Sequence, residues 1–183
     1  MNNEISKILV SEEEIDKATR RIAAEIDRDY KNSSGRLVLL GILKGSVPFL
    51  AELMKRIESN PEIEFMKVSS YGSGTKTSGS VKIILDWQRE NIEECDIIVV
   101  EDIIDSGRTL SYLCQYLEQK GAKSVRTCTL LDKPSRREVD FKPDYCGIEV
   151  PDEFVVGFGL DYDERYRALP YIGVLDPKVY SGK

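Results

Sequence analysis

The sequence contains no histidine among its 183 residues. It therefore cannot build a Ser-His-Asp triad, a Cys-His pair or a histidine-ligated metal site. Its four cysteines (Cys95, Cys114, Cys128 and Cys146) are far apart and form no C-x-x-C pair, which argues against a zinc site and a disulfide framework. We expect them to be reduced and mostly buried. Acid–base chemistry is left to Asp, Glu, Lys, Tyr or Cys, and any metal is expected to be a hard, oxygen-bound ion such as Mg²⁺.

The sequence also lacks any apolar run close to the roughly 20 residues that span a bilayer. Its first residues are acidic and carry no apolar signal-peptide stretch, so we expect a cytoplasmic protein without a membrane partner. The net charge of −6 offers no overall attraction for nucleic acid. With 41% hydrophobic residues the chain can bury a core, and its length suits one domain over residues 1–183.

The chain alternates between strand and helix patterns. Helical spacing of apolar residues predicts helices over residues 12–29, 47–57 and around 110–117, and Ser11 with Glu14 forms a capping-box pattern before the first of them. Short apolar runs predict strands at residues 36–43, 62–68, 80–85, 95–100, 125–131, 145–148, 154–158 and 171–175. This order predicts the α/β class, with a mostly parallel central sheet flanked by helices on both faces. Such sheets bind ligands beyond the carboxyl ends of their strands.

The most informative stretch is VVEDIIDSGRTL, residues 99–110, where a buried strand is followed by acids and then by the start of a helix. Backbone N–H groups at a helix start bind phosphate, a glycine allows close approach, and hydroxyls add donors. Adjacent carboxylates suit sugar hydroxyls or Mg²⁺. The ordinary alternative is a polar turn before an N-capped helix. Three acids before S-G-x-T favour a site for a phosphorylated sugar.

This segment resembles the phosphoribosyl pyrophosphate motif of the type I phosphoribosyltransferases. The form E-D-I-I-D-S-G is similar to that of the bacterial hypoxanthine-guanine enzymes, and the likeness runs from about Ser11 to Asp176. The resemblance implies a single phosphoribosyltransferase domain with a small purine-binding hood. It also implies purine salvage with Mg²⁺, in which phosphoribosyl pyrophosphate and hypoxanthine or guanine give IMP or GMP and pyrophosphate.

The resemblance also implies roles for the acidic turn. Glu101 and Asp102 would contact the ribose hydroxyls and hold Mg²⁺, and Asp105 would be the general base facing the purine N7. The residues expected at the 5′-phosphate are Ser106, Gly107, Arg108 and Thr109. The purine enzymes often carry another residue in place of this arginine, and the same G-R-T ending occurs in pyrimidine-operon regulators of the superfamily.

Two further segments have both an ordinary and a functional interpretation. Lys44 and Gly45 follow the strand predicted at residues 36–43, and their ordinary interpretation is a strand–helix turn with a solvated lysine. In similar enzymes this turn binds pyrophosphate and contains a cis peptide, here Leu43–Lys44. Ser70 and Tyr71 open a Gly/Ser/Thr-rich stretch that reads as an exposed connector. In the family it is a lid that touches pyrophosphate and excludes water.

The base would be bound by residues after the next strands. An isolated lysine such as Lys133 is usually only solvated, but by resemblance it would donate to the purine O6. Phe154, otherwise a core residue, would stack on the base, and Val155 would offer backbone hydrogen bonds. Asp161 would bind a second Mg²⁺, partly through water, and Arg167 would neutralise pyrophosphate. Val156 and Phe158 are expected to face the core.

Three alternatives stay open. The enzyme could act on adenine, xanthine, orotate or uracil. A non-catalytic RNA-binding regulator of the same fold would need a basic face, and its affinity would fall steeply with salt. A phosphoribosyl pyrophosphate synthetase fits less well, because the chain is short and shows no ATP site. Similar enzymes form dimers or tetramers, so we expect a homodimer or homotetramer.

Overall fold

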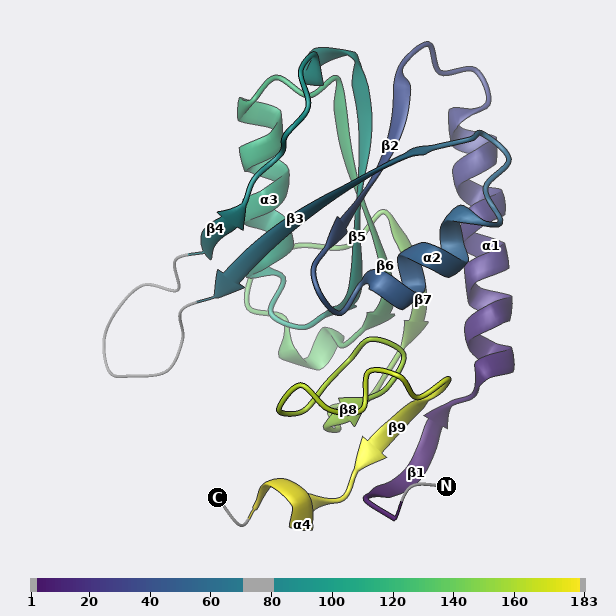
Figure 1. Cartoon of the computed structure of the whole chain (residues 1–183), viewed down its shortest axis with the longest axis vertical. Coiled ribbons are helices and arrows are strands. Elements are labelled where there is room, and N and C mark those ends of the chain that lie inside the picture. Colours follow the sequence, from purple (N-terminus) through teal and green to yellow (C-terminus); the bar gives the residue numbers. More distant parts are fainter. Residues whose placement is uncertain (1–2, 71–80, 182–183) are drawn as a thin grey trace.

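The computed structural model describes residues 3–70, without the side chain of Ser70, and residues 81–181. Its larger sheet has six strands in the order β4-β3-β2-β5-β6-β7 (Figure 1). Neighbouring strands are parallel except for the antiparallel pair β3–β4, which confirms the predicted mostly parallel sheet. The strands are β2 (Arg36–Ile42), β3 (Glu62–Ser70), β4 (Val81–Leu85), β5 (Cys95–Ile104), β6 (Ser124–Asp132) and β7 (Tyr145–Glu149).

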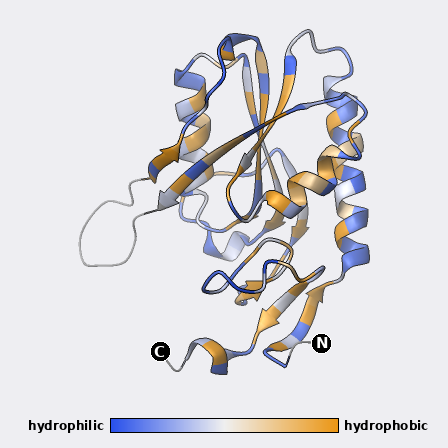
Figure 2. Ribbon diagram, in the orientation of Figure 1, coloured by the Kyte–Doolittle hydropathy of each residue, from blue (hydrophilic) through white to orange (hydrophobic). Residues whose placement is uncertain are grey.

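Helices cover both faces of this sheet. On one face lie α1 (Glu12–Tyr30) and α2 (Val47–Met54), and on the other lies α3 (Arg108–Gln119). Successive residues of a strand point to opposite faces. Accordingly, Val38 of β2 belongs to the hydrophobic cluster that includes α3, and the next residue, Leu39, belongs to the cluster of α1 and α2. Figure 2 shows hydrophobic residues along the central strands and hydrophilic ones on the outer side of the helices.

A second, three-stranded sheet forms the predicted hood at the carboxyl ends of the parallel strands (Figure 1). It consists of β1 (Ile5–Val10), β9 (Ile172–Leu175) and β8 (Val155–Val156) in that order, all antiparallel. The short helix α4 (Pro177–Tyr180) follows β9. The hood therefore unites residues from both ends of the described chain. The sequence patterns predicted neither β1 nor α4.

Several predicted boundaries need correction. The helix expected to reach residue 57 ends at Met54, and the strand expected over 154–158 contains only two residues. It stops because the next three residues, Gly157, Phe158 and Gly159, all have positive φ angles and turn the chain. Val156 is fully buried as expected, while Phe158 is only partly buried.

Two 3₁₀ turns complete the elements, η1 (Ile92–Glu94) and η2 (Pro134–Arg136). The first helix begins as predicted: Ser11 and Glu14 form a capping box in which each side chain binds the other's backbone N–H. Within residues 3–70 and 81–181, we find no helix with the length and apolar character needed to cross a bilayer.

Candidate active site

The acids of the phosphate-binding motif lie on β5 itself. The predicted strand ended at residue 100, but the observed strand continues to Ile104. It continues because β6 runs alongside in parallel register, with Glu101 opposite Thr129 and Ile103 opposite Leu131. Backbone pairing with β6 thus holds Glu101 and Asp102 on a sheet strand, which positions their carboxylates more firmly than a loop would.

These two carboxyl groups are poorly solvated. Burial and the charge of Asp102 raise the pKa of Glu101 well above its usual range. Burial also raises the pKa of Asp102 to about 6, although the backbone N–H of Ile103, at 2.9 Å, and the charge of Arg167 favour its ionised form. Among residues 3–70 and 81–181, no cation forms an ion pair with either acid, and a bound cation or sugar hydroxyls would stabilise their ionised forms.

The turn after β2 closes tightly over Asp102. The peptide Leu43–Lys44 is cis, as the resemblance implied. A Cβ on Gly45 would overlap the carboxylate of Asp102, and a Cβ on Gly159 of the hood would overlap the carbonyl oxygen of Gly45. Glycine at these two positions lets the turn, the acid and the hood meet. Lys44 is exposed and forms an ion pair with Glu164 of the hood at 3.0 Å.

Two cavities share this corner of the molecule. One, of about 300 Å³, follows the β5–α3 bend. The other, of about 250 Å³, lies under the turn after β2 and reaches Asp161 and Arg167. Glu101, Asp102 and Thr109 line both cavities. The two adjoining cavities suit a ligand with one anionic group at the bend and another near Arg167.

The bend has the geometry of an anion cradle. Gly107 is the N-cap of α3 and has φ +79°, a conformation that favours glycine. The hydroxyl of Ser106 accepts a hydrogen bond from the N–H of Arg108 at 3.3 Å. The guanidinium of Arg108 instead points to Glu138 at the surface, 2.5 Å away. Any contribution of Arg108 to phosphate binding in this conformation therefore comes from its backbone.

Lys133 and Asp105 converge beside the bend. The Lys133 side chain is almost completely buried, and its Nζ lies 3.7 Å from Asp105 Oδ1. The same ammonium donates a hydrogen bond to the carbonyl of Glu153 at 2.9 Å. No hydrogen bond to the buried Oδ1 of Asp105 is found in the described part of the chain. A buried cation beside an unsatisfied carboxylate oxygen is an arrangement suited to polarising a ligand and moving a proton.

Arg137 connects Asp105 to the end of β6, and the sequence patterns did not identify it as a site residue. Its Nη1 donates to the carbonyl of Asp105 at 2.5 Å, and its Nη2 pairs with Asp132 at the end of β6. Both side chains are about 85% buried, with exposed fractions of 16% and 15%. No pattern distinguishes Arg137 from its neighbour Arg136, which points to Asp152 at the surface. Only the tertiary fold turns one of two adjacent arginines inward.

We predict that Arg137→Leu lowers the free energy of unfolding by about 3–5 kcal/mol, because it leaves the buried Asp132 carboxylate without its partner. Arg136→Leu is the matched control. Its ion pair is about half exposed, so the loss should stay below about 1 kcal/mol. Urea unfolding of both variants measures the difference. Equal losses would contradict a structural role for Arg137.

The hood supplies the remaining predicted residues. Arg167 pairs with Asp161 at 2.9 Å and with Glu164 at 3.2 Å, and it donates to the carbonyl of Gly159 at 2.6 Å. Phe154 remains 41% exposed, whereas Val155 is buried in β8 opposite Val174 of β9. Sequence reasoning also missed Glu164, which pairs with both cations expected at the pyrophosphate, Lys44 and Arg167.

Two predicted residues cannot be placed fully. Ser70 ends β3, where it pairs with Val81 of β4, but only its backbone is described. Tyr71 lies outside the described residues. The lid interpretation of this segment therefore stays a prediction.

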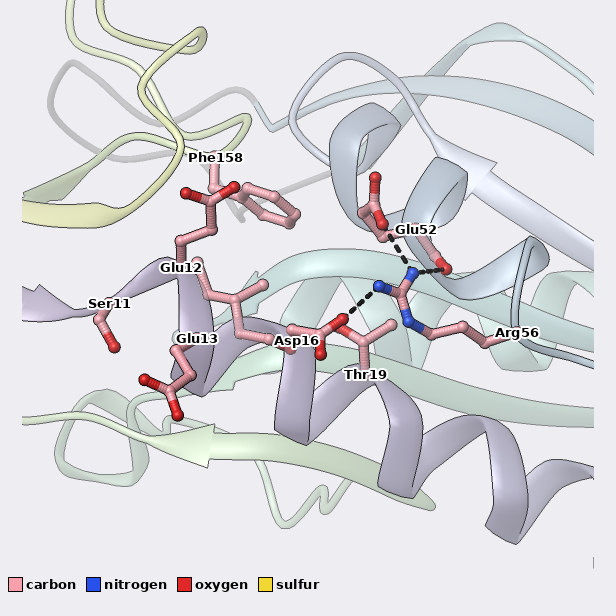
Figure 3. Close-up of a pocket in the computed structure, with 9 residues that line it drawn as sticks. Ser11, Glu12, Glu13, Asp16, Thr19, Glu52, Arg56 and Phe158 are labelled. Atoms are coloured by element: carbon pink, nitrogen blue, oxygen red, sulfur yellow. Dashed lines mark hydrogen bonds and ion pairs between the residues drawn. The ribbon is translucent and has the colours of Figure 1, made fainter.

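A larger cavity, of about 570 Å³, lies between α1, α2 and Phe158 of the hood (Figure 3). Its cation, Arg56, is already engaged by Asp16 and by Glu52, which accepts at 2.6 Å. The other charged residues that line it, Glu12 and Glu13, are acids. It contains neither a phosphate cradle nor the converging acid and lysine described above, and we place the active site at the two smaller cavities.

Comparison with known proteins agrees with this geometry. A family model described as the phosphoribosyl transferase domain matches residues 7–163. The hypoxanthine-guanine phosphoribosyltransferase of Bacillus subtilis is 53% identical over 181 residues, which cover 99% of both chains. The bifunctional protein TilS/HprT of Listeria monocytogenes is 51% identical over 99% of this chain, which spans 28% of that longer protein. A hypoxanthine phosphoribosyltransferase from Staphylococcus aureus has a crystal structure with TM-score 0.91 and 45% identity, covering 98% of this chain and 96% of that chain.

Proposed function

The chain belongs to the phosphoribosyl transferase domain family, and we propose that it transfers the phosphoribosyl group of phosphoribosyl pyrophosphate to hypoxanthine or guanine. The products would be IMP or GMP and pyrophosphate, a reaction of purine salvage. The observation that carries this proposal is the convergence of Lys133 and Asp105 at 3.7 Å, next to the phosphate cradle. Lys133 also donates to the carbonyl of Glu153, the residue before the exposed Phe154.

Each group has a place in the proposed reaction. The bond between C1′ of the donor and pyrophosphate breaks, the pyrophosphate leaves with the electron pair, and the purine N9 forms the new bond to C1′. Asp105 takes the proton from N7, and Lys133 donates a hydrogen bond to O6. The backbone of Ser106 to Thr109 holds the 5′-phosphate. Lys44 and Arg167 would spread the charge of the leaving pyrophosphate, exchanging their present partner Glu164 for it.

We also propose that Mg²⁺ takes part. The residues fit it, because Glu101 and Asp102 are adjacent oxygen ligands that both line the two cavities, and burial raises the pKa of each carboxyl group, so a bound cation would stabilise their ionised forms. In the part of the chain that the structure describes, no three Asp, Glu or Cys side chains cluster closely enough to hold a metal alone. The donor and water would therefore supply further oxygens, as is common for Mg²⁺. When bound, the ion would neutralise pyrophosphate charge. Asp161, which now pairs with Arg167, would bind a second ion, partly through water.

An activity assay with each of five bases in turn tests the proposed function. The protein, Mg²⁺ and phosphoribosyl pyrophosphate are incubated separately with hypoxanthine, guanine, xanthine, adenine and uracil, and nucleotide is measured. We expect product with hypoxanthine and guanine and little with adenine or uracil. Product with adenine alone, or RNA binding at high affinity without any transfer, would overturn the proposal in favour of one of its alternatives.

Selection of the base is expected to depend on Lys133. Hypoxanthine and guanine accept a hydrogen bond at position 6, whereas the amino group of adenine donates one. We predict that Lys133→Met, which keeps the buried aliphatic volume, narrows the preference for hypoxanthine over adenine at least tenfold, because loss of a buried donor removes the penalty for a mismatched base. The ratio of kcat/KM values for the two bases measures it.

Lys120→Met, at the surface pair with Asp86, is the control and should keep the wild-type ratio. If Lys133→Met lowers the kcat/KM values for both bases by the same factor, Lys133 does not select the base by donating a hydrogen bond to O6.

We further propose a cytoplasmic homodimer or homotetramer. All four cysteines are free, which suits a reducing compartment. On α2, Val47 and Met54 are seven residues apart, so they lie on one side of the helix, and both are more than 40% exposed. These two exposed apolar residues support a contact between subunits.

A further inference from the structure

The C-terminal helix α4 places an aromatic ring against Phe154. The ring centroids of Tyr180 and Phe154 are 5.0 Å apart with an angle of 26° between the planes, which is a stacked pair. Tyr162 contacts Phe154 edge-on at 5.6 Å and Tyr180 at 6.4 Å. Phe154 is thus part of a three-ring cluster, and yet 41% of it remains exposed.

Backbone contacts fix this stack. The N–H of Leu175 donates to the carbonyl of Phe154 at 2.9 Å, so the end of β9 is tied to the residue that carries the ring. The next residue, Asp176, caps α4 by accepting from the N–H of Lys178 at 2.9 Å. Val179 and Tyr180 then pack on the small hydrophobic cluster of the hood. Tyr180 is therefore held in place from both the strand and the helix.

We propose that Tyr180 is a positioning residue for the purine: it stacks on one face of Phe154 and leaves the opposite face for the base. The inference rests on the proposed function. Since Tyr180 already restricts the Phe154 ring, binding of the base has less side-chain freedom to remove. Lys133 donates to the carbonyl of Glu153, the residue before Phe154, so a hydrogen bond ties the group expected at O6 to the backbone beside the ring.

Binding of ligands with and without a base tests the proposal. An aromatic pair contributes enough to change affinity about two- to tenfold. We expect Tyr180→Ala to weaken IMP binding by that factor in calorimetry and to leave ribose 5-phosphate binding unchanged, because ribose 5-phosphate has no base. In steady-state assays the KM for hypoxanthine should rise by a similar factor, while kcat and the KM for phosphoribosyl pyrophosphate stay near wild type.

Three further variants show whether Tyr180 positions the base through its aromatic ring or only stabilises the fold of the hood. Tyr180→Phe keeps the stack and should behave as wild type. Tyr180→Leu preserves apolar volume without an aromatic face, so it should resemble Tyr180→Ala even if the alanine variant is unstable. Tyr112→Ala removes another half-exposed tyrosine, which stacks on Tyr116 at 6.1 Å in α3, and should leave the affinity for both ligands unchanged.

The possible contrary results have different meanings. If Tyr180→Ala and Tyr180→Leu leave IMP binding unchanged, or weaken both ligands equally, Tyr180 does not position the base. Tighter IMP binding would also overturn the inference, since Tyr180 would then cover the face that the base needs. If the wild-type protein binds ribose 5-phosphate but neither binds IMP nor forms nucleotide, the proposed function itself fails, whatever the variants do.

Discussion

Asp105→Asn is expected to lower the turnover of nucleotide formation by about 10²–10⁴-fold, the range typical for removal of a general base. The substitution keeps the size of the side chain but removes its ability to take a proton. Asp105 lies at the entrance of the phosphate bend, and Lys133 Nζ is 3.7 Å from its carboxylate. Single-turnover rates with saturating hypoxanthine and phosphoribosyl pyrophosphate measure the effect on the chemical step.

Two comparisons make this result specific. Ribose 5-phosphate should bind to Asp105→Asn with nearly wild-type affinity, because the backbone of the bend is unaltered. Asp86→Asn, which changes an acid that pairs with Lys120 at the surface and lines neither cavity, should keep wild-type turnover. Wild-type turnover in Asp105→Asn would reject Asp105 as the base. A loss of ribose 5-phosphate binding would mean that the substitution disturbs the phosphate cradle.

Gly45→Ala is expected to lower kcat/KM by at least about 100-fold, because the new methyl group would occupy the position of the Asp102 carboxylate. The carboxylate cannot move away without leaving the orientation in which it faces the two cavities. The carbonyl of Gly45 also contacts Gly159, which limits movement of the turn. Misplacement of a binding group by about 1 Å can cost about 10²-fold in rate. Steady-state kinetics with varied phosphoribosyl pyrophosphate measures the loss.

Gly35→Ala is a matched control at the opposite end of β2. A Cβ there would overlap the carboxylate of Asp96, so the type of clash is the same, but it lies away from both cavities. We expect Gly35→Ala to lower the melting temperature and to keep near wild-type kcat/KM per folded molecule. If both variants lose activity in proportion to their loss of stability, the Gly45–Asp102 contact has no specific role in the reaction.

The sequence patterns predicted the parallel sheet and the acidic residues at the carboxyl ends of its strands, because both predictions depend only on residues close together in the sequence. Buried runs such as the one before Glu101 predict parallel strands, and the acids that follow predict where ligands bind. They also predicted that β5 ends at residue 100, because charged residues seldom continue a buried strand. Pairing with β6 overrides this preference and extends the strand to Ile104.

The hood was predicted from family resemblance and could not be built from periodicity. Its central strand, β9, lies between strands from opposite ends of the sequence, with Ile5 opposite Leu175. Such long-range pairing leaves little local signal in strands of two to six residues. For the same reason the sequence did not reveal that Tyr180 stacks on Phe154 or that Glu164 bridges Lys44 and Arg167. Phe154 and Tyr180 are 26 positions apart and Lys44 and Glu164 are 120 apart, so these contacts exist only in the folded chain.

A crystal structure of the protein with Mg²⁺ and a non-hydrolysable analogue of phosphoribosyl pyrophosphate would test most directly whether the bend after β5 binds the donor. We expect the 5′-phosphate on the N–H groups of residues 106–109, the ribose hydroxyls at Glu101 and Asp102, and the pyrophosphate between Lys44 and Arg167. An analogue bound elsewhere, such as in the cavity between α1 and α2, with the bend after β5 empty, would contradict this expectation.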